Sequence, residues 1–414
     1  MSRMQMESRA QFRALLAETF RPVIYLSQWS CTAPYPLDPY QRTTPYLQTK
    51  KSIMIFRRLV SVLLFTIIVA APFLLYHLYS GQIYAYTIPL SVKLMYYVQT
   101  AIQTSMIGYV LLVYQFRSSF HRFYFERLVG VLVEFGRPDM SERLFALQTS
   151  FRRALPVFPL YLALVIAAYI LHDQSYGVLA KIVIFLATQL MATSFTLLYV
   201  AIFGTVCILL RQMNDTLERI PQEPQGHNKP LANGAPFYTS PVSLTRDDER
   251  AIEKIRLLQL QLLQIVRRTN GGEYGRLVIM ILLATFIYLN TELLQLYQGV
   301  KAGAFSFDVI GSKVLNSTHK IAMLFMFTYP NRLIQTQNIR GLKILYQLNR
   351  PGNDSRTNEI TNRFITQTTL FLEKAHEVYG MISIDMTLIL SIVGGLTNIL
   401  VVLVQFADAK PSQK

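Results

Sequence analysis

Apolar residues along this chain gather in seven long stretches, which polar and charged segments separate. A helix needs about 20 mostly apolar residues to cross the hydrocarbon core of a bilayer. The stretches show no sustained alternation of apolar and polar positions, and in lipid only helices and closed barrels satisfy every backbone hydrogen bond. We therefore expect transmembrane helices at Leu59–Tyr79, Ile88–Phe116, Ala154–Leu171, Val178–Leu210, Leu277–Tyr297, Val314–Tyr329 and Tyr379–Phe406. The fourth stretch exceeds one perpendicular crossing, so it is expected to tilt or to project past the membrane.

Lysine and arginine predict the orientation of these helices. Thirty-three of the 40 Lys and Arg residues lie in or at the ends of four segments, namely the segment before the first span and the loops at 117–153, 212–275 and 333–377. Cytoplasmic loops carry an excess of these residues. We therefore place the N-terminus in the cytoplasm and, after seven crossings, the C-terminus outside.

Composition supports a membrane protein and limits the possible partners. Apolar residues make up 52% of the chain and charged residues 15%, whereas soluble domains carry about 25% charged residues. This composition therefore argues against a soluble enzyme. The formal net charge of +16 could suggest a nucleic-acid partner, but the excess lies in the cytoplasmic loops, where it is expected to contact anionic lipid headgroups. We expect membrane lipids, and no nucleic acid, as partners.

Three stretches outside the spans carry helical signals. Between Arg246 and Asn270, apolar residues repeat at helical spacing, namely at Ile252, Ile255, Leu258, Leu262 and Ile265. The other two stretches are Asn338–Asn349 and Glu359–Glu377. We interpret all three as helices that extend spans 5, 6 and 7 into the cytoplasm and pack together; separate surface helices are the alternative. The segment 221–244, rich in Pro, Gly and Asn, is predicted to be disordered.

Hydrogen-bonding side chains gather in the outer halves of the spans. Span 2 carries Tyr96, Gln99 and Gln103 on one helical face, and others lie near the outer ends of spans 3 and 5, namely Tyr169, His172 and Asn290. A pocket lined by aromatic rings with a few polar groups suits a small organic ligand. The alternatives are a belt of interfacial tyrosines for the aromatic residues and interhelical hydrogen bonds for the glutamines.

Enzymatic and metal-binding signals are missing from the sequence. His, Cys, Asp and Glu show no metal-ligand spacing, and neither a nucleophile motif nor a phosphate loop occurs. We therefore expect no catalytic activity, no cofactor and no metal. Of the three N-x-[ST] sequons, the predicted topology leaves Asn316 outside, at the outer edge of span 6, as the candidate glycosylation site.

The last span contains two polar features. Asp385 lies near its cytoplasmic end, where its carboxylate can cap a helix that opens at Met386 or, in several copies around an axis, attract cations. Beyond it, small and polar positions form one stripe along the helix, at Ser391, Gly394, Asn398, Val402 and Gln405. Such a stripe faces something other than lipid; tight helix packing is the alternative explanation.

The end of this span resembles the C-terminal signature of the insect gustatory receptor family. That signature is Thr-Tyr, five apolar residues and Gln-Phe; here Leu400–Val404 precede Gln405-Phe406, and Asn398-Ile399 replaces the Thr-Tyr pair. The resemblance implies a homo- or heterotetrameric, ligand-gated, non-selective cation channel that detects small-molecule tastants in the plasma membrane of sensory neurons. It further implies that the last helix lines the pore, that Gln405 and Phe406 form the outer gate, and that the ligand pocket lies in the outer halves of spans 1 to 6.

These inferences divide the chain into seven parts. They are a cytoplasmic N-terminal segment at 1–58, the ligand-pocket spans at 59–211, a cytoplasmic loop at 212–275 with its helix at 246–270, spans 5 and 6 at 276–332, cytoplasmic anchor helices at 333–378, a pore-lining helix at 379–406 and an extracellular tail at 407–414.

Two other classes also have several membrane spans. A rhodopsin-like G-protein-coupled receptor needs an outside N-terminus and D/E-R-Y and NPxxY motifs, which are not present in this sequence. A secondary transporter tends to show two related halves with interrupted helices, and no such duplication is evident here. The sequence therefore favours the channel over both.

Overall fold

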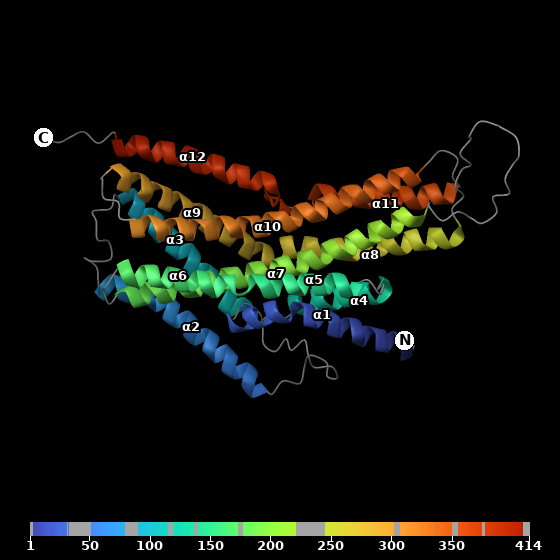
Figure 1. Cartoon of the computed structure of the whole chain (residues 1–414), viewed down its shortest axis with the longest axis horizontal. Coiled ribbons are helices and arrows are strands. Elements are labelled where there is room, and N and C mark those ends of the chain that lie inside the picture. Colours follow the sequence, from blue (N-terminus) through green and yellow to red (C-terminus); the bar gives the residue numbers. More distant parts are fainter. Residues whose placement is uncertain are drawn as a thin grey trace, which may run out of the picture.

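The computed structural model describes residues 3–30, 32, 51–78, 90–114, 119–135, 140–172, 177–220, 245–301, 307–349, 355–374 and 377–408. These residues form a long bundle of helices (Figure 1). In chain order the elements are α1 (Arg3–Trp29), α2 (Lys51–Leu78), α3 (Leu90–Tyr109), the π-helix η1 (Val110–Tyr114), α4 (Ser119–Phe135), α5 (Met140–Ala154), α6 (Val157–His172), α7 (Gly177–Arg219), α8 (Arg246–Gly271), α9 (Glu273–Lys301), α10 (Phe307–Leu348), α11 (Ser355–Lys374), β1 (Glu377–Val378), β2 (Ile382–Ser383) and α12 (Met386–Asp408).

The predicted all-helical fold class is confirmed. The seven apolar stretches fall on α2, on α3 with η1, and on α6, α7, α9, α10 and α12. Among the described residues, the helical segments that are long and apolar enough to cross a membrane are 140–167, 187–219 and 274–294. Shorter apolar helices occupy 58–70 and 386–399. The 43 residues of α7 make a helix about 65 Å long, so it projects well past a bilayer core of about 30 Å, as predicted for the fourth span.

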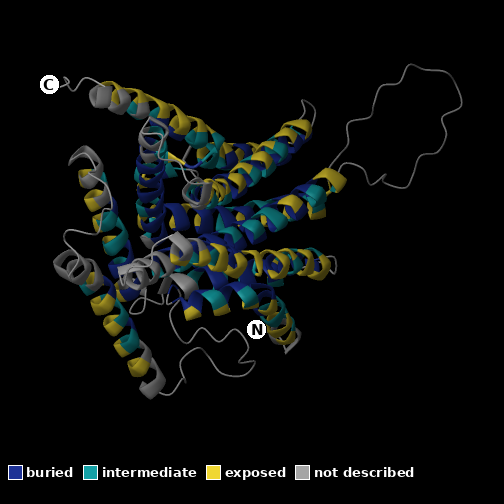
Figure 2. Ribbon diagram, turned by 60° about the vertical axis from the view of Figure 1, so that its left-hand side comes forward, coloured by how far each residue is buried: buried dark blue, intermediate teal, exposed yellow. Residues whose placement is uncertain are grey.

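α7 lies at the centre of the bundle. It packs against α1, α5, α6, α8 and α10, and its middle turns are buried on all sides, for example at Phe195, Leu198, Ile202 and Phe203. A helix that is apolar all round belongs in an interior of this kind. Buried residues are concentrated along this axis, whereas the outer helices keep exposed faces (Figure 2).

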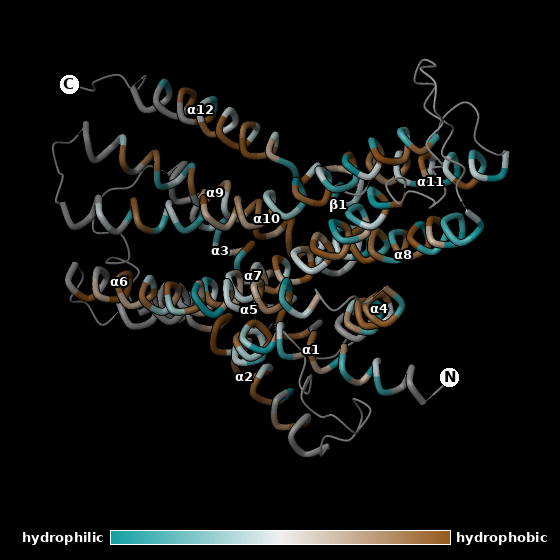
Figure 3. The backbone as a smooth tube through the Cα atoms, turned by 45° about the vertical axis from the view of Figure 1, so that its right-hand side comes forward, coloured by the Kyte–Doolittle hydropathy of each residue, from teal (hydrophilic) through white to brown (hydrophobic). Residues whose placement is uncertain are grey.

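The three additional helical stretches pack together at one end of the bundle. All five periodic apolar residues of α8 are buried, because α8 lies against α4, α7, α9 and α11. The segment Asn338–Asn349 continues α10 without a break as far as Leu348, and α11 packs on both α8 and α10. The alternative of separate surface helices is therefore wrong. Hydrophilic residues are frequent along α8 and α11, whereas α12 is mostly apolar (Figure 3).

One predicted helical stretch contains a hairpin instead. The sequence led us to expect helix from Glu359 to Glu377 and a span from Tyr379, but β1 and β2 pair antiparallel across residues 377–383. Two consecutive residues with positive φ, Tyr379 at 53° and Gly380 at 66°, turn the chain, as in the turns that connect short hairpins. The hairpin separates α11 from α12, so α12 begins only at Met386.

Candidate functional site

The end of the bundle that the predicted topology places outside contains an aromatic and polar cluster between α6, α7 and α10, which we call the outer site. The rings of Tyr161 and His319 stack with centroids 4.3 Å apart, and Phe158 stacks beside both. His319 Nε2 lies 3.2 Å from the Thr193 hydroxyl. The Tyr161 hydroxyl donates to Asn316 Oδ1 at 2.9 Å. Three helices thus meet through side chains that offer both flat apolar surface and hydrogen-bonding groups, which is the composition of a small-molecule site.

A charged group lies next to this cluster. Lys320 is only 5% exposed, and its Nζ donates to Gln189 Oε1 of α7 at 3.1 Å. The same ammonium lies 5.7 Å from the centre of the Tyr288 ring of α9. Ionisable groups inside a membrane protein are costly and usually have a function. Lys320 therefore extends the candidate site from α6 and α7 towards α9.

The predicted ligand residues are only partly described. Gln99 is 7% exposed and its Oε1 is buried without a hydrogen-bond partner among the described residues. Gln103 is half-buried. Asn290 is buried and donates to the Phe286 carbonyl of its own helix at 2.9 Å. Because α3 packs against α9, these residues lie on neighbouring helices. The side chains of Tyr96, Tyr169 and His172 fall outside the described part.

Several residues of this site were not predicted from the sequence, namely Tyr161, Gln189, Thr193, His319 and Lys320. Lys320 is one of the seven Lys and Arg residues outside the four basic segments, on the side that the charge pattern predicts to be outside. The signal that could have identified Lys320 is its position within the apolar stretch Val314–Tyr329, where burying a lysine is energetically unfavourable. The hydroxyl and amide of α7 carry no such signal, because Thr and Gln are ordinary in a helix interior that packs on other helices.

The candidate glycosylation site is buried. Asn316 is 4% exposed, and its amide oxygen accepts the hydrogen bond from Tyr161. A glycan needs an exposed amide nitrogen in an outer loop. Glycosylation of Asn316 stays a prediction, and the packing described here argues against it.

The polar stripe of the last helix points away from the rest of the chain. α12 packs on α9 and α10, and it buries Ile392 and Leu396. The stripe residues Ser391, Gly394, Asn398, Val402 and Gln405 are all exposed. Phe406 continues the helix next to Gln405, and its side chain lies outside the described part. Packing among the described residues therefore does not explain the stripe.

Asp385 caps this helix. Its Oδ1 accepts from the backbone N–H of Thr387 at 2.9 Å and of Leu388 at 3.3 Å. Of the two roles considered for Asp385, the structure therefore shows the cap of a helix that begins at Met386. The carboxylate is half-buried, so it also presents negative charge at the beginning of α12.

The hairpin before α12 is attached to the junction of α8 and α9. The Tyr379 hydroxyl donates to the Gly272 carbonyl at 2.7 Å, and Arg276 Nε donates to the same hydroxyl at 3.2 Å. Gly275 lies directly beneath, since a Cβ atom there would lie 2.0 Å from the Asn270 carbonyl oxygen and 3.2 Å from the Tyr379 ring. We call the group Gly272, Gly275, Arg276 and Tyr379 the latch.

A buried hydrogen-bond network ties the latch to the core. Asn270, in the last turn of α8, accepts from the Tyr199 hydroxyl of α7 at 2.9 Å. Asn331 of α10 donates to that hydroxyl at 2.7 Å. The three helices are thus fixed where the latch begins, because buried networks of this kind are rigid when their members are paired.

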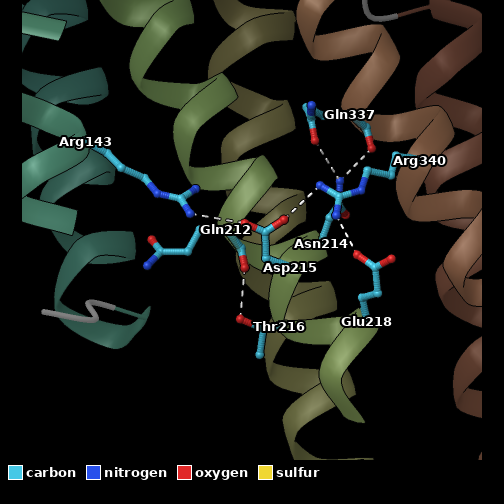
Figure 4. Close-up of polar contacts among 8 residues, drawn as sticks. All are labelled: Arg143, Gln212, Asn214, Asp215, Thr216, Glu218, Gln337 and Arg340. Atoms are coloured by element: carbon cyan, nitrogen blue, oxygen red, sulfur yellow. Dashed lines mark hydrogen bonds and ion pairs between the residues drawn. The ribbon is translucent and has the colours of Figure 1, made fainter. Parts of the chain in front are cut away.

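An ion network holds α5, α7 and α10 together at the opposite end of the bundle, which the predicted topology places in the cytoplasm and which we call the inner end (Figure 4). Asp215 of α7 accepts from Arg143 at 3.2 Å and from Arg340 at 2.8 Å. Arg340 also pairs with Glu218 at 2.5 Å. These groups are about one-third exposed or more, apart from Asp215, so each pair contributes modestly. Further along, Arg256 pairs with Glu253 and lowers the pKa of that carboxyl.

Two surface grooves lie at this inner end and not at the outer site. One, of about 900 Å³, is lined by residues of α8 and α11, including Arg256 and Arg363. The other, of about 460 Å³, is lined by residues of α5 and α7, including Arg143 and Arg211. Both are open to the surface, so they suit protein or lipid contacts better than enclosure of a small molecule.

The chain is similar to known chemosensory proteins in sequence pattern and in fold. The family model described as "7tm Chemosensory receptor" matches residues 20–410. The insect olfactory receptor OR5 from Machilis hrabei in complex with eugenol is similar, with a TM-score of 0.67 at 11% identity, over 94% of this chain and 97% of that one. The structure of OR5 from the same organism without eugenol gives a TM-score of 0.57 at 10% identity, over 93% and 97% of the two chains. No curated protein matches the sequence.

Proposed function

The chain belongs to the 7tm chemosensory receptor family, and we propose that it is a gustatory receptor that works as a ligand-gated, non-selective cation channel. In this proposal four subunits, identical or mixed with other gustatory receptors, surround a pore, and a small-molecule tastant opens it. The observation that carries the proposal is the exposed polar stripe of α12. A helix that buries one apolar face in its own bundle and leaves a polar line outside needs an aqueous or protein neighbour.

The gate of the proposed channel is at the outer end of α12. Gln405 and Phe406 occupy the positions that the family resemblance assigns to the gate, and Asn398 and Val402 continue the stripe towards the middle of the helix. Asp385 lies at the inner mouth, where four carboxylates would attract cations. A ring of Phe406 side chains would close the pore by excluding water, since hydrophobic constrictions gate by dewetting.

The ligand acts on the outer cluster of α6, α7 and α10. A ligand shifts the gating equilibrium only by binding the open arrangement better than the closed one. About 3–5 kcal/mol of differential binding, shared over the subunits, moves a channel from mostly closed to mostly open. A few hydrogen bonds and aromatic contacts in each subunit supply this amount.

α9 transmits the change to the pore helix. Its Tyr288 ring faces Lys320 of the outer site, and its Phe286 ring would lie 3.2 Å from a Cβ atom at Gly395 of α12. Its first turn carries the latch residue Arg276, which holds the hairpin before α12. A shift of this one helix therefore moves the middle of α12 and the hairpin that precedes it. The helices α8 and α11 and the inner end of α10 serve as the cytoplasmic anchor between subunits.

The orientation belongs to the same proposal. The N-terminus is cytoplasmic, the C-terminus is extracellular, and the receptor lies in the plasma membrane of a sensory neuron. Figure 1 supports this arrangement, because the start of α1 and the end of α12 lie at opposite ends of the long axis. An epitope tag at the N-terminus should be accessible only after permeabilisation. Staining of intact cells would instead favour the topology of a rhodopsin-like receptor.

Electrophysiology tests the channel directly. The full chain is expressed in a cell line, and a tastant library is screened by calcium influx and then by voltage clamp. Gln405→Ala should alter conductance or gating while surface expression persists. Thr397→Val is the matched control, because Thr397 is exposed on α12 off the stripe and its hydroxyl bonds only its own helix, to the Val393 carbonyl. Unchanged currents in Gln405→Ala would refute the gate, and substrate uptake without current would indicate a transporter.

A further inference from the structure

We propose that the outer site selects organic anions, and that the carboxylate or equivalent acidic group of the ligand pairs with Lys320. The inference rests on the proposed function, because it names the ligand class of the same site. The inference goes beyond the proposed function because it assigns the sign of the ligand charge and the residue that binds the charged group.

The first observation is that Lys320 is buried without a counterion among the described residues. Its side chain is almost fully enclosed, and within the described part of the chain it forms no ion pair. The nearby carboxylate of α9, Glu292, is engaged by Lys313 at 2.8 Å. A buried charge is normally paired, because removing an ammonium from water without a partner is strongly unfavourable. An anion that entered the site would supply the missing partner.

The second observation is that the present partners of Lys320 are neutral acceptors. Gln189 Oε1 accepts one hydrogen bond at 3.1 Å, and Tyr288 offers the face of its ring. An ammonium has three donors. An amide oxygen carries only a partial charge, whereas a carboxylate adds the Coulomb attraction of a full negative charge to the hydrogen bond. A carboxylate oxygen in the place of Gln189 Oε1 would therefore bind Lys320 better than the amide does.

The third observation is that other donors converge on the same face of α7. Gln189 and Thr193 are four residues apart and so lie on one side of the helix. Gln189 meets Lys320 there, and Thr193 meets the neighbouring His319. The stacked rings of Tyr161 and His319 form an apolar wall beside these donors. An acidic head with a flat apolar body matches this combination of charge, hydroxyl and ring.

Matched pairs of ligands provide the test. The probes are aromatic and aliphatic carboxylates and their primary amides, for example benzoate with benzamide and hexanoate with hexanamide, at neutral pH. Channels with the wild-type sequence should respond to the acid of an active pair at about tenfold lower concentration than to its amide. Lys320→Met, which keeps the volume and removes the charge, should bring this ratio close to one. Lys320→Arg should retain most of it.

Lys343→Met is the matched control, because Lys343 is exposed on the inner half of the same helix. It should leave the acid-to-amide ratio unchanged. Surface biotinylation and size-exclusion profiles establish that each variant is folded. Equal potency of acids and amides on the wild-type channel would overturn the proposal, and so would an acid preference that survives Lys320→Met.

A binding measurement separates this inference from the channel itself. The full-length receptor in lipid nanodiscs is titrated with the same acid and amide pairs, and ligand-induced thermal stabilisation is recorded. Acid-selective stabilisation that Lys320→Met abolishes would support the anion site even if no ligand evokes a current. The absence of any ligand-evoked current would refute the proposed channel alone. Currents evoked by neutral compounds, with no acid selectivity in either assay, would keep the channel and reject the anion site.

Discussion

The latch offers the sharpest test of how ligand binding would reach the proposed pore. Replacing Tyr379 by Phe removes only a hydroxyl. The backbone keeps its positive φ of 53°, which Phe tolerates no better and no worse than Tyr. The variant therefore isolates two hydrogen bonds, one to the Gly272 carbonyl and one from Arg276. These bonds hold the hairpin that leads into α12.

The size of the effect follows from these contacts. An intramolecular hydrogen bond contributes about 0.5–1.5 kcal/mol net. Tyr379 is 39% exposed, so water replaces part of the hydrogen bonding that the substitution removes. The two bonds together are therefore expected to contribute about 1 kcal/mol per subunit. If four subunits release the hairpin together, the gating equilibrium changes by about 4 kcal/mol, which is nearly a thousandfold.

Whole-cell recording measures this shift. We take the described arrangement as the closed state of the proposed channel. Removing the bonds then disfavours the closed state relative to the open one, so Tyr379→Phe should raise the basal current and lower the ligand concentration for half-maximal response. Tyr346→Phe is the control, since Tyr346 is exposed on α10 far from the latch in sequence and in the fold. If Tyr379→Phe gave the wild-type concentration–response curve at equal surface expression, the latch hydrogen bonds would not contribute to the gating equilibrium.

Two further substitutions test the latch and the start of α12. Gly275→Ala should destabilise the receptor by about 1–3 kcal/mol in thermal unfolding, because its Cβ would meet the carbonyl of the buried, hydrogen-bonded Asn270; a wild-type melting temperature would contradict the close packing. Asp385→Ala should lower stability by about 1 kcal/mol through loss of the cap. Asp385→Asn keeps the cap but removes the negative charge, so it should instead lower single-channel cation conductance. Unchanged conductance would mean that Asp385 has only a structural role.

The helices were predictable because their signals are local and repetitive. Apolar stretches near bilayer length determine where α2, α6 and α9 lie, and the spacing of Ile252, Leu258 and Ile265 identifies the buried face of α8. The cap at Asp385 was predictable for the same reason, since an N-cap depends on the next three residues only. The hairpin at 377–383 was missed because Tyr379 adopts a left-handed conformation that tertiary contacts impose and that its residue type disfavours.

The outer site was harder to predict, because its residues come from helices far apart in the sequence. Tyr161, Thr193 and His319 show no periodicity that sets them apart, and only the packing of α6, α7 and α10 brings them together.

Lys320 is different, because its cost in an apolar helix is visible in the sequence itself. Counting it as a topology signal assumed that it lies at the outer surface, whereas the burial of its side chain and its contacts with α7 and α9 show an interior position. Its partner Gln189 is 131 residues away. Lysine is an unfavourable residue for a helix of this kind unless something compensates for its burial. The amide of Gln189 and the Tyr288 ring compensate in part, and the remaining imbalance is what a ligand of opposite charge would remove.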